Sequence, residues 1–542
     1  MTHESTGRNQ DIVLKGGLVV DGSGEPPYTA NVLLRGGKIH RITPKPVRTT
    51  GTVIDCAGRV VAPGFIDVNS HLDWEIPLKG HEETKYPFTA QGITTVVAGT
   101  CGSAAAVFRE GTIWRKQVEA AQPGAGHLSL QWSSAAELFE RLAAAGTSQN
   151  IALLAGHGST RLSIRGGNPS PLHPYETKEL LWLLEKALDE GARGVSLGLH
   201  TEPGMFARPE ELKEIALLVK GKRKILAIHP RVSAAVSPGV PRRIGEPHNI
   251  VALKEALDLA RATGVRLQIS GLMFVGSRTW RTAGEAIALV DAAQNGGVDV
   301  RFDMQPLHCG AMVVAGLFPA WFRARGVEAY ADPSAMRRAR RELRHALRLL
   351  GFGPADIQVT DALDEDLSEY NGRFLSEIAR LRRLGPVDAL MDLARRSEGR
   401  AKILVRRVND DRIVEALMTH PACLFGTGAW VEREGVQNPV AFGAFPRLLQ
   451  VARERRVLRV EEIVRRMSGA AAERFGIADR GVLREGMAAD VVVFDWESVA
   501  DATSEAEPDA APTGIDYVFV NGVKIIGSGK KEQPLNAGVP LP

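Results

Sequence analysis

The chain has 542 residues, which is too many for one compact hydrophobic core. Its 44% hydrophobic and 24% charged residues are ordinary for a soluble globular protein. The formal net charge of +4 is small for this length, so it gives no reason to expect nucleic acid or an anionic membrane as a partner.

The N-terminus and the cysteines indicate where the protein works. The first residues are polar and lack the basic start and apolar core of a signal peptide, and no apolar run is long enough to span a bilayer. The four cysteines are scattered rather than spaced as a disulfide framework. We therefore expect a cytoplasmic protein without membrane association. The cysteines are Cys56, Cys101, Cys309 and Cys423.

The two ends of the chain have the pattern of β-strands. Short apolar runs separated by glycine occupy residues 11–17, 32–34 and 60–62, and β-branched runs return at residues 490–495 and 517–522. Two all-β segments so far apart in the sequence predict one β-sandwich domain built from both termini.

Between these ends, strand and helix patterns alternate. Helical patterns such as residues 175–190 and 209–219 separate short apolar strands. Repeated βα units of this spacing indicate a parallel sheet, and a closed (β/α)8 barrel of the TIM type is the expected fold. The expected strands are residues 94–98, 151–154, 194–197, 225–228, 267–270 and 298–302.

Residues 316–407 interrupt this alternation. They are rich in arginine and mostly helical in pattern, which indicates an insertion from a βα loop whose charges form a solvated helix face rather than a nucleic-acid surface. The expected domain order is the first part of the β-sandwich, the first part of the barrel, the insertion, the last part of the barrel and the rest of the β-sandwich. These parts are residues 1–61, 62–315, 316–407, 408–475 and 476–542.

Several motifs, in one order along the chain, carry a family resemblance. Residues 60–71 read as the entry to a barrel, residues 91–102 as a second strand that ends in Cys101, and residues 479–490 as the return into the β domain. With residues 191–199, they resemble the D-aminoacylase branch of the amidohydrolase superfamily, also called N-acyl-D-amino-acid deacylases. The resemblance covers nearly the whole length. It implies a hydrolase that cleaves the amide bond of a small N-acylated substrate.

The resemblance also implies a metal site at the C-terminal ends of the barrel strands. His71, Cys101 and His229 match metal-binding positions of the family. Imidazole and thiolate bind zinc, and zinc that keeps an open position activates a water for attack on an amide. The alternative for each residue is a buried packing role.

Other metal positions of the family are substituted. Asn69 stands in place of the first histidine, Gly271 in place of another histidine, and Met273 where a lysine is common. Thr427 and Gly428 stand where the family has Ser-Asp, and that aspartate is the general base. The sequence therefore predicts a reduced site with one zinc ion or none.

The substrate positions differ as well. Val440 stands where an arginine binds the substrate carboxylate, and Thr201 where a tyrosine is common. The missing arginine argues against an ordinary N-acyl-D-amino acid as the substrate.

Replacement groups follow the predicted strands. We expect general acid–base residues among Glu202, Asp303 and His157, and substrate-binding residues among Arg161, His200 and His308. Cys309 follows the same strand as His308. One of the histidines could complete a mononuclear site with Cys101 and His229.

Three function classes remain open on these residues. The first is an amidohydrolase that uses the reduced metal site. The second is an inactive amidohydrolase-like scaffold, in which the insertion binds a protein partner or the chain forms a homo-oligomer. The third is a lyase, isomerase or cyclase that uses histidine acid–base chemistry without a metal.

Overall fold

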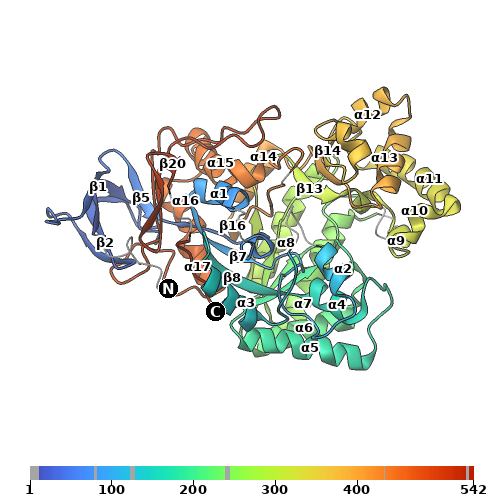
Figure 1. The fold of residues 1–542 in the computed structure, drawn as a ribbon, viewed down its shortest axis with the longest axis horizontal. Helices are drawn as coiled ribbons and strands as arrows, with labels where there is room; N and C mark the ends of the chain where they lie inside the picture. Colours follow the sequence, from blue (N-terminus) through green and yellow to red (C-terminus); the bar gives the residue numbers. More distant parts are fainter. Residues whose placement is uncertain (1–10, 79–81, 122–127, 238–244, 433, 533–535) are drawn as a thin grey trace.

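Eight parallel strands form the centre of the structure, a computed structural model that describes residues 11–78, 82–121, 128–237, 245–432, 434–532 and 536–542 (Figure 1). The amide of Val68 donates a hydrogen bond to the carbonyl of Phe425 (3.2 Å), so the last strand returns to the first and the barrel is nearly closed. The predicted (β/α)8 barrel is confirmed. The strands, in sheet order, are β6 (Phe65–Asp67), β7 (Ile93–Ala98), β8 (Asn150–Gly156), β9 (Gly194–Gly198), β10 (Ile225–His229), β11 (Arg266–Ile269), β12 (Val300–Met304) and β16 (Cys423–Phe425).

The barrel strands form because their residues suit burial on both faces. Every residue of β7 and β8 is buried, as expected for a parallel sheet covered by helices. The helices present apolar faces to this sheet and form one continuous core with it, except that α17 packs in a second cluster with the inner residues of the strands. They are α1 (Glu82–Ala90), α2 (Arg115–Ala120), α3 (Ala135–Ala145), α4 (His157–Arg165), α5 (Pro174–Asp189), α6 (Pro209–Gly221), α7 (His248–Thr263), α8 (Ala283–Asn295), α14 (Asp411–Thr419), α15 (Val440–Arg455), α16 (Val460–Met467) and α17 (Gly469–Phe475).

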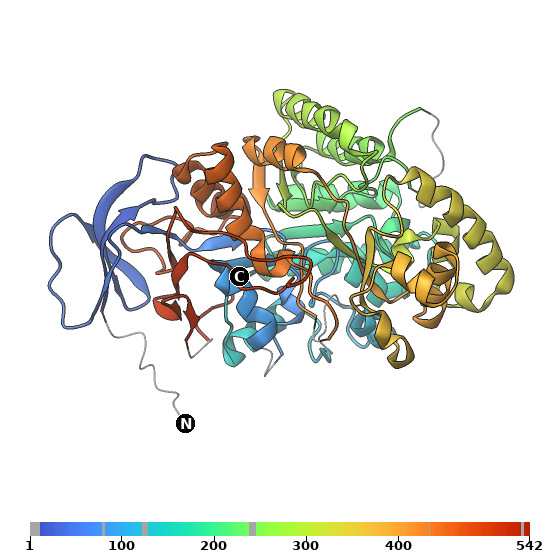
Figure 2. The same ribbon diagram turned by 90° about the horizontal axis from the view of Figure 1, so that it is seen from above.

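A second sheet of nine strands combines both ends of the chain, as the sequence predicts. Its junction is the antiparallel pair β5–β17, in which Val61 lies opposite Val493. Figures 1 and 2 place this β domain at one end of the barrel. The strands are β1 (Ile12–Val19), β2 (Tyr28–Arg35), β3 (Lys38–Thr43), β4 (Thr52–Asp55), β5 (Val60–Pro63), β17 (Val491–Phe494), β18 (Ile515–Val520), β19 (Val523–Gly527) and β20 (Lys530–Lys531).

The segment between β12 and β16 lies at the other end of the molecule, coloured yellow in Figures 1 and 2. It has its own hydrophobic core and, besides helices, a three-stranded antiparallel sheet that the helical pattern did not predict. No described helix is long and apolar enough to cross a membrane. Apart from α14, which belongs to the barrel, the elements of the segment are β13 (Gly310–Val313), α9 (Ala320–Arg323), α10 (Glu328–Ala331), α11 (Pro333–Leu349), β14 (Ile357–Asp361), α12 (Leu375–Leu381), α13 (Pro386–Arg396) and β15 (Lys402–Val405).

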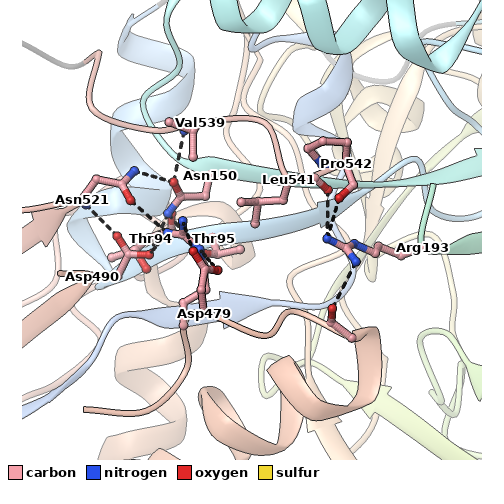
Figure 3. A network of polar contacts seen from close by, with 12 residues as sticks. Thr94, Thr95, Asn150, Arg193, Asp479, Asp490, Asn521, Val539, Leu541 and Pro542 are labelled. Atoms are coloured by element: carbon pink, nitrogen blue, oxygen red, sulfur yellow. Dashed lines mark hydrogen bonds and ion pairs between the residues drawn. The ribbon is translucent and has the colours of Figure 1, made fainter. Parts of the chain in front are cut away.

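A buried polar network ties the β domain to the N-terminal end of the barrel strands (Figure 3). Asp490 accepts hydrogen bonds from Nδ2 of Asn150 (2.8 Å) and the amide of Asn521 (2.7 Å), and it forms an ion pair with Arg480. Beside it, Arg193 donates to the carbonyl of Leu541 (3.3 Å). This end of the barrel is therefore filled by structural contacts, which leaves the opposite end for chemistry.

Candidate functional site

Five polar side chains gather at the C-terminal end of the barrel. Asn69 follows β6, Cys101 follows β7 and His200 follows β9. His229 is the last residue of β10, and Asp303 lies in β12. Parallel strands in a barrel deliver their last residues to one edge, so residues far apart in the sequence become neighbours here.

Cys101 and His229 are in direct contact. The sulfur of Cys101 lies 3.3 Å from Nδ1 of His229 and 4.0 Å from Oδ1 of Asn69. Burial raises the pKa of the Cys101 thiol to about 12 and lowers the pKa of His229 to about 4. The pair on its own is therefore a neutral thiol beside a neutral imidazole, and a bound cation would favour the thiolate.

Two further imidazoles border this pair. The ring of His200 stacks on His229 with 3.8 Å between the ring centroids, and His71 lies against the ring of Trp430 at 5.8 Å. Burial lowers the pKa of His200 well below its usual value, and the charges of neighbouring groups add to the effect. Nδ1 of His71 and Nδ1 of His200 are buried without a hydrogen-bond partner among the described residues. Both nitrogens are therefore available to a ligand.

The carboxyl group of Asp303 is held by three donors. Its Oδ1 accepts hydrogen bonds from Nδ2 of Asn69 (3.0 Å) and the amide of Gly271 (2.8 Å), and its Oδ2 accepts one from Nε2 of Gln268 (2.9 Å). Burial nevertheless raises the pKa of Asp303 to about 6. A carboxylate with a pKa near neutrality can take up and release a proton under physiological conditions. Asn69 thus orients this acid, a role that the substitution of a metal histidine did not predict.

A second buried acid, Asp67 of β6, binds the chain that follows β16 and so helps to join the first and last strands of the barrel. Its Oδ1 accepts from the amides of Asn69 (3.0 Å) and Thr427 (2.9 Å), and its Oδ2 accepts from the Thr427 hydroxyl (2.6 Å). Burial raises the pKa of Asp67 from 3.8 to about 7. Thr427, which stands beside the missing general base, therefore has a structural role.

We expect Asp67→Asn to change how stability depends on pH. Because the pKa of Asp67 is raised in the folded state, its contribution to the free energy of unfolding is complete below pH 3.8 and is lost as the pH rises through about 7. The amide does not ionise, so between pH 5 and pH 8 the variant should gain about 2–3 kcal/mol relative to the wild type. Urea unfolding across this range measures the difference. Parallel pH curves for Asp67→Asn and the wild type would contradict the prediction.

Gly271 and Gly428 stand at positions where the resemblance implies a metal-binding side chain. A Cβ atom added at Gly271 would lie 3.3 Å from Cε1 of His229, and one added at Gly428 would lie 3.6 Å from Nδ2 of Asn69. Both glycines have positive φ, so side chains there would also be strained. The lost ligand positions therefore do adjoin the site.

The contact between Cys101 and His229 has the spacing of two ligands of one metal ion. Zinc bonds of about 2.3 Å to sulfur and 2.1 Å to nitrogen put two tetrahedral ligands roughly 3.6 Å apart, close to the separation of Cys101 and His229. Within the described part of the chain, no group of three or more His, Cys, Asp or Glu side chains is arranged to hold a metal ion. A second ion has no donor set at Asn69, Gly271 or Gly428.

Two predicted residues, His157 and Arg161, belong to a separate buried cluster. Nε2 of His157 lies 2.7 Å from Oε1 of Glu211, and Nε of Arg161 lies 3.4 Å from the same oxygen. His157 and Arg161 are completely buried. The guanidinium of Arg161 also donates to the carbonyls of Pro203 and Ser170. Their partners are thus protein groups.

The other two predicted residues lie toward the rim. Glu202 forms an ion pair with Arg323 of α9, and His308, which is exposed, lies 3.2 Å from Asp411. Of the acid–base residues expected from the sequence, the structure brings only Asp303 into contact with the cluster around Asn69.

Sequence reasoning missed several residues of the site. Gln268 was detectable as a polar residue inside an apolar strand, and it holds Asp303. Trp430 gave no signal, because aromatic residues are common in cores. Glu211 and Arg323 could not be found from the sequence, because each reaches its partner across more than 50 residues of chain.

Comparisons with known proteins agree with this architecture. The model of the amidohydrolase family matches residues 425–526. The N-acyl-D-glutamate deacylase of Alcaligenes xylosoxydans xylosoxydans is 30% identical over 95% of this chain and 93% of its own length. The D-aminoacylase of the same organism is 28% identical over 95% and 94%.

Solved structures extend the likeness to three dimensions. The N-acyl-D-glutamate deacylase of Bordetella bronchiseptica, solved with zinc and a phosphonate inhibitor, has a TM-score of 0.80 and 28% identity over 98% of this chain and 99% of its own. A D-aminoacylase with a binuclear metal centre has a TM-score of 0.77 and 25% identity, with the same coverage of each chain. The chain belongs to the amidohydrolase family, in its N-acyl-D-amino-acid deacylase branch. The predicted family is confirmed.

Proposed function

We propose that the chain hydrolyses the amide bond of a small N-acylated substrate at the C-terminal end of its barrel. The observation that carries the proposal is the match over 95% of the chain and 93% of an N-acyl-D-glutamate deacylase. A scaffold without activity, the alternative from the sequence, is not favoured by relatives that are deacylases along their whole length.

The relatives suggest which substrates to try first. Two of them are deacylases of N-acyl-D-glutamate and N-acyl-D-aspartate. Both substrates are N-acylated amino acids with a second carboxylate, so N-acetyl-D-glutamate is the first compound to test. Its hydrolysis would correct the expectation drawn from Val440, which stands where an arginine binds the substrate carboxylate in the family. The four cysteines, all free in the structure, support the proposal of a reducing compartment such as the cytoplasm.

The proposed cofactor is one zinc ion with Cys101 and His229 as protein ligands. Their contact at 3.3 Å supports this assignment. His71 stays the predicted third ligand, supported by its buried and unpartnered Nδ1. Zinc in such a site supplies Lewis-acid polarisation of the amide carbonyl.

The proposed proton acceptor is Asp303. Hydrogen bonds from Asn69, Gln268 and Gly271 fix the carboxylate, and with a pKa of about 6 it is mostly ionised at neutral pH. It can therefore accept a proton from the attacking water and return it to the leaving amine. Glu202 and His157 remain predictions, and their pairing with Arg323 and Glu211 makes them less available for proton transfer.

The experiment that tests this function measures zinc and hydrolysis on the same protein. Chain purified without chelator or histidine tag is expected to hold about one zinc per chain, since Cys and His ligands bind this ion. It should release acetate from N-acetyl-D-glutamate faster than from the L enantiomer. Removing zinc with a chelator should abolish hydrolysis, and adding zinc should restore it. Cys101→Ser should lower both readouts.

Two results would overturn the proposal. A zinc content below about a tenth of an equivalent per chain, after growth with added zinc, would contradict the assignment of Cys101 and His229 as metal ligands. Absence of hydrolysis across a panel of N-acyl amino acids, in zinc-loaded protein, would leave the scaffold and the metal-independent lyase, isomerase or cyclase as the functions to test.

A further inference from the structure

One side chain of the segment between β12 and β16 that contacts the site is Arg323, at the end of α9. The side chain is only 6% exposed, although arginine usually lies at the surface. Its Nη2 donates to Oε2 of Glu202 (2.7 Å) and to the carbonyl of His200 (3.1 Å). Its Nε donates to the other carboxylate oxygen of Glu202. Two contacts to one carboxylate fix the orientation of both groups.

The loop that Arg323 holds carries His200. Elsewhere the loop is anchored by Leu199, whose amide donates to the carbonyl of His229 (3.2 Å), and by Met205, whose carbonyl accepts from Arg231 (2.6 Å). The buried Arg161 also donates to the carbonyl of Pro203 (3.4 Å), so the far side of the loop is held and the bond from Arg323 acts on the part next to His200. The contacts of His200 include the stacking of its ring on His229 and the bond from Arg323 to its carbonyl.

We propose that Arg323 is a positioning residue of the site, which holds the imidazole of His200 over His229 through the backbone of His200 and the carboxylate of Glu202. The inference rests on the proposed function for its kinetic readout. It assigns the segment between β12 and β16 a part in completing the site, beyond the partner surface suggested by its many arginines. Glu202 is the anchor point of this contact.

The alternative is that Arg323 and Glu202 form an ion pair that does not affect the position of His200. Exposed pairs contribute about 0–1 kcal/mol because solvent screens them. Arg323 differs from such pairs by its burial and by its bond to the backbone of a residue that stacks on a proposed zinc ligand. A shift of that backbone would move His200, and a misplacement of about 1 Å can cost on the order of 10²-fold in rate.

The variants are chosen to separate positioning from general stability. Arg323→Met removes the donors and keeps much of the apolar stem, Arg323→Lys keeps the charge, and Glu202→Gln removes only the ionic partner. Arg325→Met is the matched control, because Arg325 lies two residues further on and pairs with Asp332 (2.8 Å) within the same segment.

The first readout is the NMR signal of the His200 ring in protein with 13C-labelled histidine, assigned with His200→Gln. Stacked rings shift each other's signals, so Arg323→Met should move the signals of His200 and His229 toward ordinary values. The signal of His157, which is buried against Glu211, should stay in place. Arg325→Met should leave all three unchanged.

The second readout is the split between kcat and KM. Loss of His200 positioning should lower kcat by about tenfold or more in Arg323→Met. Arg323→Lys should retain part of the wild-type kcat that Arg323→Met loses. The KM of both variants should stay within about twofold of the wild-type value.

The proposal is overturned if the His200 signal of folded Arg323→Met matches the wild type. A moved His157 signal would reveal that Arg323→Met unfolds. In that case Glu202→Gln is the deciding variant: a shifted His200 signal in Glu202→Gln supports the proposal, and an unshifted one overturns it. The NMR result stands even if no variant hydrolyses any substrate, so failure of the proposed function is distinguishable.

Discussion

Replacing His229 by asparagine is expected to abolish most hydrolysis of N-acetyl-D-glutamate. The change removes the imidazole that contacts Cys101 and that His200 stacks on, so both residues lose their common neighbour. Even indirect partners of a metal site are worth about 10–100-fold, and loss of a ligand should lower kcat/KM by about 10²-fold or more. Zinc content should fall in parallel.

The control for this experiment is His40→Asn. His40 is exposed on β3 of the β domain, so this variant should keep its zinc and its rate. Full activity in His229→Asn, with normal zinc, would contradict the assignment. A normal rate with lost zinc would instead point to hydrolysis that depends on the protein's own acid–base groups.

Among the substitutions considered, Asp490→Asn is expected to cause the largest loss in the free energy of unfolding. Three donors converge on the Asp490 carboxylate, from Asn150, Arg480 and Asn521. The asparagine amide can accept at one oxygen only, and it leaves the Arg480 side chain, 4% exposed, without its buried counter-charge. Breaking a buried pair in this way costs about 3–5 kcal/mol. Urea unfolding of the two proteins measures the loss.

The matched control removes the other partner of the same arginine. Asp479 also pairs with Arg480 (3.1 Å), but its side chain is 49% exposed. Asp479→Asn should therefore cost less than about 1 kcal/mol. Equal losses for the two variants would mean that the network in Figure 3 derives its strength from charge alone rather than from burial.

The fold was accessible from the sequence because its signals are local and repeated. Six of the barrel strands, β7 to β12, were predicted as short apolar runs, whereas β16, only three residues long, was not. The strand pattern at both termini predicted the β domain, which the pairing of β5 with β17 confirms. The sheet β13–β15–β14 was missed, because its short strands lie among arginine-rich helices.

The site was accessible only in part. Cys101 follows β7 and His229 ends β10, so the barrel topology brings both to the same edge although two strands lie between them. The environment of Glu202 depends on Arg323, and that of His157 on Glu211, and neither partner is near in the sequence. Asn69 was interpreted as a lost ligand, whereas its side chain supports Asp303. Hydrogen-bond geometry of this kind is set by packing and has no sequence pattern.

The pairing of β5 with β17 has a consequence for synthesis on the ribosome. Val493 is made about 430 residues after its partner Val61, a delay of roughly 20–90 s at ordinary translation rates. During this time the strands β1 to β5 lack the neighbour that completes their sheet, and their apolar residues have no covering partner. We therefore expect the newly made N-terminal strands to be the part of this chain that most needs a chaperone.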